Sequence, residues 1–281
     1  MTVTEPHGTY TCPRYEGTVE SPADPYNGYA MVQCRRCSLL HTFERDFAIS
    51  QYEDVYAHQS ACRGMIDAAQ RTSSGEMGYR DLWWFKGLGL RWLERHGKGR
   101  LLDVGCGPGT FLLVARQRGW EVTRLEPAQL ARTFDLEVFN GLVKALARQS
   151  PVRFRAITSF EVIEHVSRPL AMLRTIRELL EPGGHMLVSV PNLDDPYCLK
   201  QQIPSNVPPV HINFFNRRSL GEAMRAAGLD VLKFFTLPIP SSSVRNVHGW
   251  RGFVMRVPFL FTMRLVGRAD GTTLVALGRK M

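Results

Sequence analysis

A dense glycine loop, LLDVGCGPGTFL at residues 101–112, constrains the fold more than any other feature of this sequence. A buried-strand pattern precedes it at 100–104, and a helical pattern follows at 110–118. Glycines at alternate positions let the backbone turn sharply and approach a ligand closely. A dinucleotide site would need a third glycine where Thr110 stands, and Asp103 would put a carboxylate near the phosphate. The loop therefore predicts a ligand site of another kind.

Strand and helix patterns alternate along the rest of the chain. Short apolar runs bounded by glycine or proline predict strands, whereas apolar residues at three- and four-residue spacing predict helices. Such alternation is typical of an open α/β sheet with helices on both faces. We predict a Rossmann-like doubly wound sheet, mostly parallel, with a last antiparallel strand. Strands are expected at 100–104, 121–126, 136–139, 153–159, 185–190, 229–235 and 272–277, and helices at 75–96, 110–118, 169–180 and 218–227.

Two acidic residues at the ends of the first two strands define the chemistry of the ligand. Sheets of this class bind ligands at the carboxyl ends of their strands. Asp103, just before the glycines, suits a ligand with an ammonium group. Glu126 ends the second strand, where a carboxylate can accept hydrogen bonds from both hydroxyls of a ribose. A ligand with a ribose, an amino group and no phosphate is S-adenosylmethionine.

Several motifs, taken together, resemble those of the class I S-adenosylmethionine-dependent methyltransferases. The loop has the form D-x-G-C-G-x-G and is followed by the strand-end acid Glu126. The resemblance covers roughly residues 75–281 and implies an enzyme with S-adenosylmethionine as its cofactor. The further matching motifs are SFEVIEHV at 159–166, LEPGG at 180–184, PN at 191–192 and HINFFNRRSL at 211–220.

The resemblance also implies a set of cofactor-binding residues. Asp103 and the Gly105–Gly109 backbone would hold the methionyl part and Glu126 the ribose, while the residues after the fourth strand would lie near the sulfonium. The segment between Glu126 and Gly141 is short for the family, and no acidic residue follows the third strand to contact the adenine. The implied residues are Asp103, Gly105, Cys106, Gly107, Gly109, Glu126, Pro127, Gly141, Leu142, Ser159, Phe160 and Glu161.

Two histidines are candidates for the catalytic base. Methyl transfer to a hydroxyl requires the loss of its proton, and a histidine of near-neutral pKa is a natural acceptor. His165 follows the fourth strand in EVIEHV, and His211 opens HINFF before a late helix. A structural role for His165 stays open, in which the Glu164–His165 pair fixes the loop. Glu161 and Glu164 are further candidates for the base.

The first 45 residues predict a small module rich in turns and cysteine. It is similar to the zinc-ribbon-like modules that precede some methyltransferase domains, including sugar methyltransferases, and Cys3His is an accepted ligand set for structural zinc. Tyr15 stands where those modules have another cysteine. Either His41 or His7 completes the site, or the module is metal-free and held by aromatic packing. The candidate zinc ligands are Cys12, Cys34, Cys37 and His41.

The chain is expected to divide into three regions. Residues 1–45 form the zinc-ribbon-like module, 46–98 a helical connector and 99–281 the S-adenosylmethionine-binding methyltransferase domain. An apolar insertion with regularly placed arginines is expected at 238–268, between the last two strands. It either docks its apolar face on the domain or forms a lid, in which 250–266 is a candidate for membrane contact.

Charge distribution leaves several functions open. Residues 196–281 carry 12 basic and 3 acidic side chains, whereas residues 1–195 carry 23 of each, so the net charge of +9 lies at one end. A basic end suits an acidic substrate, a membrane surface or RNA equally well.

The favoured hypothesis is methyl transfer to a small-molecule acceptor, to an oxygen of a sugar or secondary metabolite. One alternative is an RNA base methyltransferase with a zinc module, but SFEVIEHV lacks the N-P-P-[FY] type of signature that encloses a flipped base. Nucleic acid is therefore not the expected partner. The other alternative is a catalytically inactive methyltransferase-like binding protein, against which the intact glycine loop argues. The start MTVTEPHGTY has no features of a secretory signal, so a cytoplasmic location is expected.

Overall fold

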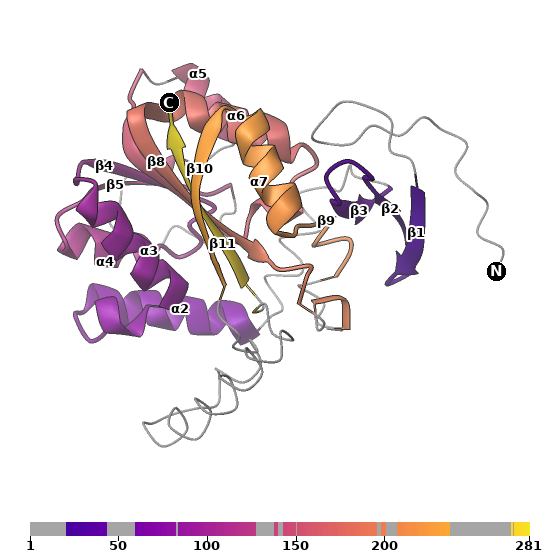
Figure 1. Ribbon diagram of the computed structural model, residues 1–281. Coiled ribbons are helices and arrows are strands. Elements are labelled where there is room, and N and C mark those ends of the chain that lie inside the picture. Colours follow the sequence, from indigo (N-terminus) through magenta and orange to yellow (C-terminus); the bar gives the residue numbers. More distant parts are fainter. Residues whose placement is uncertain are drawn as a thin grey trace, which may run out of the picture.

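A seven-stranded sheet forms the centre of the chain in the computed structural model (Figure 1). The structure describes residues 21–43, 60–82, 84–127, 138–139, 143–149, 151–195, 198–200, 207–236, 271 and 273–281. The strands follow the order β10-β11-β8-β7-β4-β5-β6. Their bounds are β4 Arg100–Val104, β5 Glu121–Leu125, β6 Val138–Phe139, β7 Phe154–Phe160, β8 Leu180–Pro191, β10 Leu229–Thr236 and β11 Thr273–Lys280.

The sheet is mostly parallel, as predicted. Strands β6, β5, β4, β7 and β8 pair with one another in parallel. Strand β11 lies between β8 and β10 and is antiparallel to both, which confirms the antiparallel last strand. Because the parallel strands point the same way, the carboxyl ends of β4, β5 and β7 meet at one edge of the sheet.

Helices cover both faces of the sheet (Figure 1). Successive side chains of a strand point to opposite faces, and β4 shows this directly. Leu101 belongs to one apolar core together with Phe85 of α3. Leu102 belongs to the other, together with Leu173 of α6 and Leu220 of α7. One face carries α2 (Ser60–Ser73), α3 (Trp84–Arg95) and α4 (Thr110–Gln117), and the other α5 (Val143–Gln149), α6 (Pro169–Leu179) and α7 (Arg217–Ala226).

The helix expected at 75–96 is wrong at its beginning. Gly75 has a φ of 83°, a turn follows, and only the short 3-10 helix η1 (Tyr79–Asp81) precedes α3. Helix α2 lies within the predicted helical connector at 46–98, but its bounds were not predicted, and α5 was not predicted at all. Helix α2 buries the small residues Ala69 and Thr72, so no stripe of large apolar side chains marks it in the sequence.

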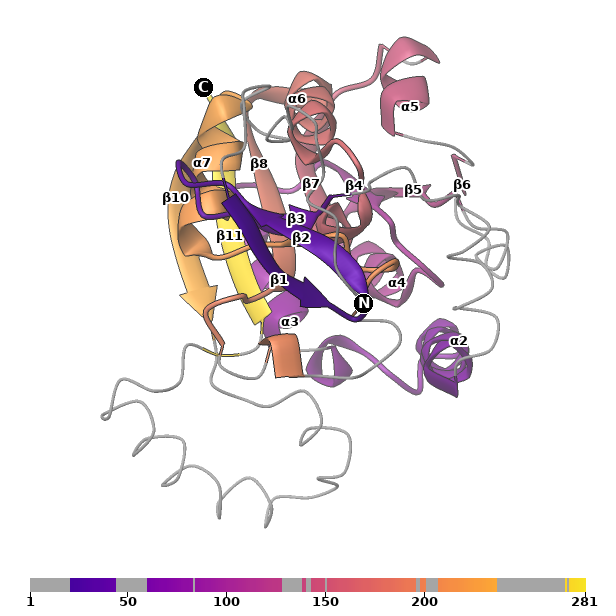
Figure 2. The ribbon, with the colours of Figure 1, turned by 90° about the vertical axis from the view of Figure 1, so that its right-hand side faces the viewer.

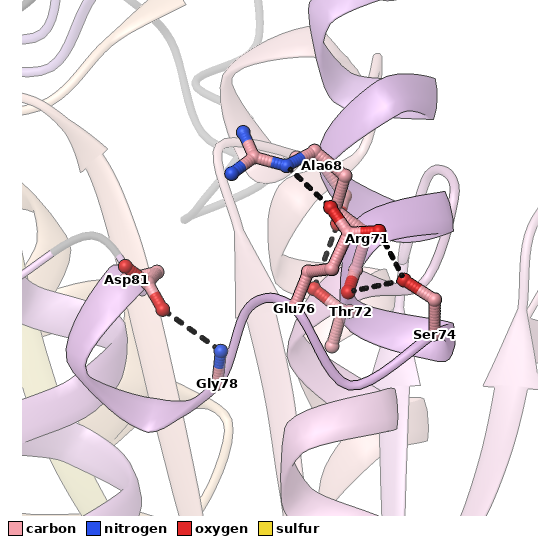
Figure 3. A network of polar contacts seen from close by, with 7 residues as sticks. All are labelled: Ala68, Arg71, Thr72, Ser74, Glu76, Gly78 and Asp81. Carbon is pink, nitrogen blue, oxygen red and sulfur yellow. Dashed lines mark hydrogen bonds and ion pairs between the residues drawn. The ribbon is translucent and has the colours of Figure 1, made fainter.

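Polar contacts close the turn between α2 and η1 (Figure 3). Ser74 Oγ donates to the Arg71 carbonyl oxygen at 3.1 Å and to Glu76 Oε1 at 3.2 Å. Arg71 Nε donates to Glu76 Oε2 at 3.4 Å. The Gly78 amide donates to Asp81 Oδ2 at 2.8 Å, at the start of η1. These local contacts set the direction in which the chain leaves α2 toward α3.

A second, small sheet joins the front of the chain to the main domain (Figure 2). The antiparallel strands β1 (Ser21–Tyr26), β2 (Tyr29–Gln33) and β3 (Leu40–Thr42) are extended by β9 (Asn213–Phe214). Cys34, Cys37 and Leu39 lie in the same apolar core as the main sheet. The predicted domain boundary at residue 45 stays a prediction, but residues on both of its sides share one core.

Some sequence-based predictions fall on residues that the structure does not describe. The insertion at 238–268, with the candidate membrane contact at 250–266, lies between β10 and β11 in such a stretch. Cys12, Gly141 and Leu142 also lie outside the described residues. Among the helices that the structure does describe, none has the length and apolar character needed to cross a membrane.

The contact between α3 and β8 gives a test of the fold. In Gly89→Ala the added methyl would overlap Cδ2 of the buried Leu187. Overpacking of this kind should lower the free energy of unfolding by about 1–3 kcal/mol, measured by urea denaturation. Gly87→Ala is the control on the same helix, because its Cβ would lie 3.5 Å from the Tyr79 ring, in ordinary contact. Alanine favours a helix, so this variant should be neutral or stabilised; equal effects in both variants would contradict the packing.

Candidate functional site

A buried carboxylate, Asp103, marks the carboxyl edge of β4. Its exposure is 2 %, and its Oδ1 accepts a 2.7 Å hydrogen bond from Thr158 Oγ1 on the neighbouring strand β7. Burial raises the pKa of Asp103 to about 6, although the Lys86 ammonium and the Thr158 hydroxyl both act to lower it. The carboxylate is therefore charged at neutral pH but held away from water, which suits it to a cationic partner.

The glycine loop passes directly beside the turn after β7. Gly105 and Gly109 have φ values of 72° and 87°, in the left-handed region. The Gly105 amide donates to the Leu125 carbonyl oxygen at 2.8 Å. A Cβ at position 105 would overlap Val162 Cγ2. Backbone conformation and close approach thus both require glycine at position 105.

Two side chains at the end of β5 hold Gly107 by its two peptide groups. Glu126 Oε2 accepts a 2.9 Å hydrogen bond from the Gly107 amide. Arg124, which is fully buried, donates from Nη2 to the Gly107 carbonyl oxygen at 2.9 Å and from Nε to Cys106 Sγ at 3.5 Å. The sequence pointed to Glu126 but missed Arg124, which lies at one of the two buried positions of the strand EVTRL. Burial raises the pKa of the Cys106 thiol to about 12, so it stays protonated.

A second residue missed by the sequence analysis is Lys86 of α3. Its Nζ lies 4.8 Å from the centroid of the Phe160 ring. Burial lowers the pKa of Lys86, while Asp103 and Glu161 act in the opposite direction by favouring the charged form. The edge of the sheet therefore combines a buried anion with a partly buried cation. The sequence signal was weak, since Lys86 is one cation on an otherwise apolar stretch, WWFKGLGL.

The three residues expected near the sulfonium have different environments. Ser159 is buried in β7, and Phe160 packs edge-to-face on Phe111 with ring centroids 4.9 Å apart. Glu161 has a φ of 56°, which is unusual for a residue other than glycine. Its Oε1 accepts a 2.7 Å hydrogen bond from Ser189 Oγ on β8. The turn after β7 thus holds Glu161 in a strained conformation at the edge of the sheet, as functional sites often do.

The two candidate bases, His165 and His211, lie against each other. Their ring centroids are 4.6 Å apart, and the rings meet edge-to-face. His165 belongs to the short 3-10 helix η3 (Ile163–His165), and its Nδ1 lies 2.8 Å from the Val210 carbonyl oxygen. Burial lowers the pKa of His165 to about 4. Burial also lowers the pKa of His211 well below its usual value, and repulsion between the two imidazoles, if both were protonated, lowers it further. Both imidazoles are therefore neutral at pH 7, with pKa values below the near-neutral value expected from the sequence.

Glu164 completes this cluster. It is fully buried, and its Oε1 lies 3.9 Å from His165 Nε2. Burial, together with the nearby Glu161, raises the pKa of Glu164. One potential ligand atom from each of Glu164, His165 and His211 lies within 4.8 Å of the others. The sequence named all three residues as candidates but did not predict that they converge.

The predicted zinc ligands are described only in part. Cys34 and Cys37 are buried, and a tight turn connects them to β3, in which the Ser38 amide donates to the Cys34 carbonyl oxygen at 2.7 Å. His41 Nδ1 lies 2.9 Å from the Thr42 carbonyl oxygen. Within the described residues, Cys34, Cys37 and His41 do not form a group of ligand atoms that are all within 4.8 Å. Since Cys12 lies outside them, zinc stays a prediction.

Comparison with known families gives a match over the central part of the chain. The family model described as "Methyltransferase domain" matches residues 79–233, more than half of the chain. The matched segment includes the glycine loop, the end of β5 and the turn after β7.

Curated relatives match over a shorter stretch. The ubiquinone biosynthesis O-methyltransferase of Azotobacter vinelandii is 33% identical over 138 residues, which are 44% of this chain and 59% of that protein. The protein of the same name from Vibrio cholerae is 36% identical over 103 residues, 33% of this chain and 42% of that protein. The chain thus spans less than two thirds of the length of the curated relatives it matches.

Solved structures share the fold at low identity. One is the 1,6-didemethyltoxoflavin-N1-methyltransferase of Burkholderia thailandensis with bound 1,6-didemethyltoxoflavin and S-adenosylhomocysteine. Its TM-score is 0.52 at 18% identity, covering 93% of this chain and 100% of that one. A SAM dependent methyltransferase from Archaeoglobus fulgidus has a TM-score of 0.50 at 17% identity and covers 69% of this chain and 94% of its own.

Arg124 offers a test of how the loop is held. Arg124→Met should lower the free energy of unfolding by roughly 1.5–3 kcal/mol, because it removes a buried hydrogen bond from a charged donor to the Gly107 carbonyl oxygen. Thermal and urea denaturation would measure the change. Arg100→Met is the control, since Arg100 is exposed at the opposite end of the neighbouring strand β4. Similar losses in the two variants would show that Arg124 does not hold the loop.

Proposed function

Because the chain belongs to the methyltransferase-domain family, as a class I S-adenosylmethionine-dependent methyltransferase, we propose that it methylates an oxygen of a small-molecule acceptor, such as a sugar or secondary metabolite. The names of the curated relatives favour oxygen as the methylated atom. The observation that carries the proposal is the pair of opposite charges beside the glycine loop, Asp103 and Lys86.

These residues fit the cofactor. S-adenosylmethionine carries the reactive methyl group on a sulfonium sulfur and ends in a free amino acid, with one ammonium and one carboxylate group. Asp103 would accept the ammonium group, and Lys86 would bind the carboxylate. Glu126, which also accepts a hydrogen bond from the Gly107 amide, would accept hydrogen bonds from the ribose hydroxyls. A zwitterionic end would therefore find a partner of opposite charge for each of its two charges.

The acceptor side of the proposal rests on the histidine cluster. In-line methyl transfer needs little more from the protein than alignment and the removal of the acceptor's proton. His211 and His165 are neutral at pH 7, so each keeps a lone pair on one ring nitrogen. We assign to this cluster the promotion of proton loss from the acceptor hydroxyl, with His211 as the first candidate and His165 as the second.

Binding of the cofactor product should depend on pH through Asp103. Below a pH of about 6 the carboxyl becomes protonated and no longer attracts an ammonium group. We therefore expect the affinity for S-adenosylhomocysteine, measured by calorimetry, to fall as the pH drops from 7 through this value, by up to about tenfold per pH unit. Asp103→Asn should bind more weakly at neutral pH and lose most of this dependence. Asp230→Asn, at an exposed carboxylate, is the control and should behave as the parent does. An affinity of the parent that is equal at pH 5 and pH 7 would contradict the assignment of Asp103.

The activity assay uses a panel of candidate acceptors. Phenols, catechols, hydroxylated quinones, sugars and RNA fragments are tested for release of S-adenosylhomocysteine, and the best substrate is then used with variants. His211→Asn should lower kcat by about 10²–10⁴-fold, the usual contribution of a general base, while product affinity is unchanged. His185→Asn is the control, at a buried histidine in the middle of β8. A normal kcat in His211→Asn would rule out the assigned role, and turnover of RNA alone would overturn the small-molecule proposal.

A further inference from the structure

The amino end of the parallel strands brings together three cations that the cofactor site does not use. They are Arg153 just before β7, Arg177 in the last turn of α6 and Lys280 at the end of β11. Strand β11 ends at this edge of the sheet, where the end of the chain is marked C in Figure 1. Strand β7 is seven residues long, so this edge lies about 20 Å from the carboxyl edge that holds the glycine loop.

Backbone pairing gathers these cations around Leu180, the first residue of β8. Lys280 Nζ donates to the Leu180 carbonyl oxygen at 2.7 Å. Leu180 pairs with Phe154, the residue after Arg153. It also directly follows the last turn of α6, which carries Arg177. The three cationic side chains therefore start from backbone positions that the fold itself places next to one another.

The guanidinium group of Arg177 is held in a partly enclosed position. Its Nε is buried and has no hydrogen-bond partner among the described residues. The same atom lies 2.9 Å from the point at which a Cβ would stand on Gly228, so the absence of a side chain there leaves room for it. Leu229, the next residue, pairs with Lys280, which places both cations at the same corner of the sheet. An anion would compensate for the burial of Arg177, because a guanidinium cannot be deprotonated in a protein.

The three positive charges repel one another, and the surrounding chain offsets them only in part. Burial lowers the pKa of the Lys280 ammonium group, and Arg177 and Arg153 lower it further, whereas Glu178 acts in the opposite direction. Within the part of the chain that the structure describes, none of the three cations forms an ion pair. Three positive charges and the one negative charge of Glu178 leave an excess of two. This excess matches the charge of a phosphate group near pH 7.

We propose that Arg153, Arg177 and Lys280 bind a phosphate-type oxyanion, either inorganic phosphate or the phosphate group of a metabolite. A guanidinium group presents planar N–H donors that match phosphate oxygens, and the ammonium group has two hydrogens beyond the one that it donates to Leu180. Because this corner is far from the carboxyl edge, the ligand would not occupy the cofactor site. The competing explanation is that the cations only stabilise the carbonyl end of α6. The site goes beyond the proposed function and does not depend on it.

The test measures binding of inorganic phosphate to the full chain by calorimetry at neutral pH, with chloride keeping the ionic strength constant. The parent should bind one phosphate per chain, and it should bind acetate, a monoanion, more weakly. Arg177→Gln and Lys280→Gln should each weaken phosphate binding by at least about tenfold, because each removes a charge-assisted hydrogen bond. Arg91→Gln is the matched control, since Arg91 is an exposed arginine of α3, on the opposite face of the sheet from α6. It should bind phosphate as the parent does.

Three results would overturn the proposal: no phosphate binding by the parent, equal binding by the parent and both cluster variants, or equal binding of acetate and phosphate. Should the variants fail to fold, judged by circular dichroism, acylation of lysines in the parent decides. Phosphate should slow the acylation of Lys280, followed by mass spectrometry, and leave that of the exposed Lys233 unchanged. An unchanged rate at Lys280 would reject the site. None of these measurements uses the cofactor or activity, so their failure is distinguishable from failure of the proposed function.

Discussion

The close approach of the glycine loop to Val162 is the contact on which the rest of the site depends. No side chain fits at position 105, so the loop after β4 and the turn after β7 touch without a gap. The same turn continues into η3, whose carbonyl oxygens accept hydrogen bonds from the Asn213 side chain of β9 and from the Ile212 amide just before it. Strand β9 in turn pairs with β3 of the small sheet. One steric constraint therefore aligns the glycine loop, the histidine cluster and the front of the chain.

Charge divides the carboxyl edge of the sheet into two parts. Beside the glycine loop, the buried Asp103 and the partly buried Lys86 have opposite charges, which suits a zwitterionic ligand. In the turn after β7, the buried carboxyl group of Glu164 lies beside His165, whose ring packs on that of His211. Buried groups of this kind do little for stability, because desolvation offsets much of what pairing gains. Their presence at one edge is better explained by ligand binding.

The sequence predicted what local patterns record and missed what only folding brings together. The alternation of apolar strands and the glycines at 105, 107 and 109 were enough to place the sheet and its edge. The bounds of helix α2 within the predicted helical connector were missed because the helix buries small residues, Ala69 and Thr72, instead of a large apolar stripe. Arg124 and Lys86 were missed because no motif marks them, and their roles arise from burial beside the loop. His165 and His211 were named separately, but their contact joins segments far apart in the chain.

The central claim is that the anion and cation beside the glycine loop bind the amino-acid end of S-adenosylmethionine. A crystal structure of the full chain with S-adenosylhomocysteine tests it most directly. We predict that the amino group lies within hydrogen-bond distance of the Asp103 carboxylate, the carboxylate group near Lys86 Nζ, and the ribose against Glu126. A complex in which the amino-acid end contacts neither Asp103 nor Lys86 would contradict the account, whatever the acceptor proves to be.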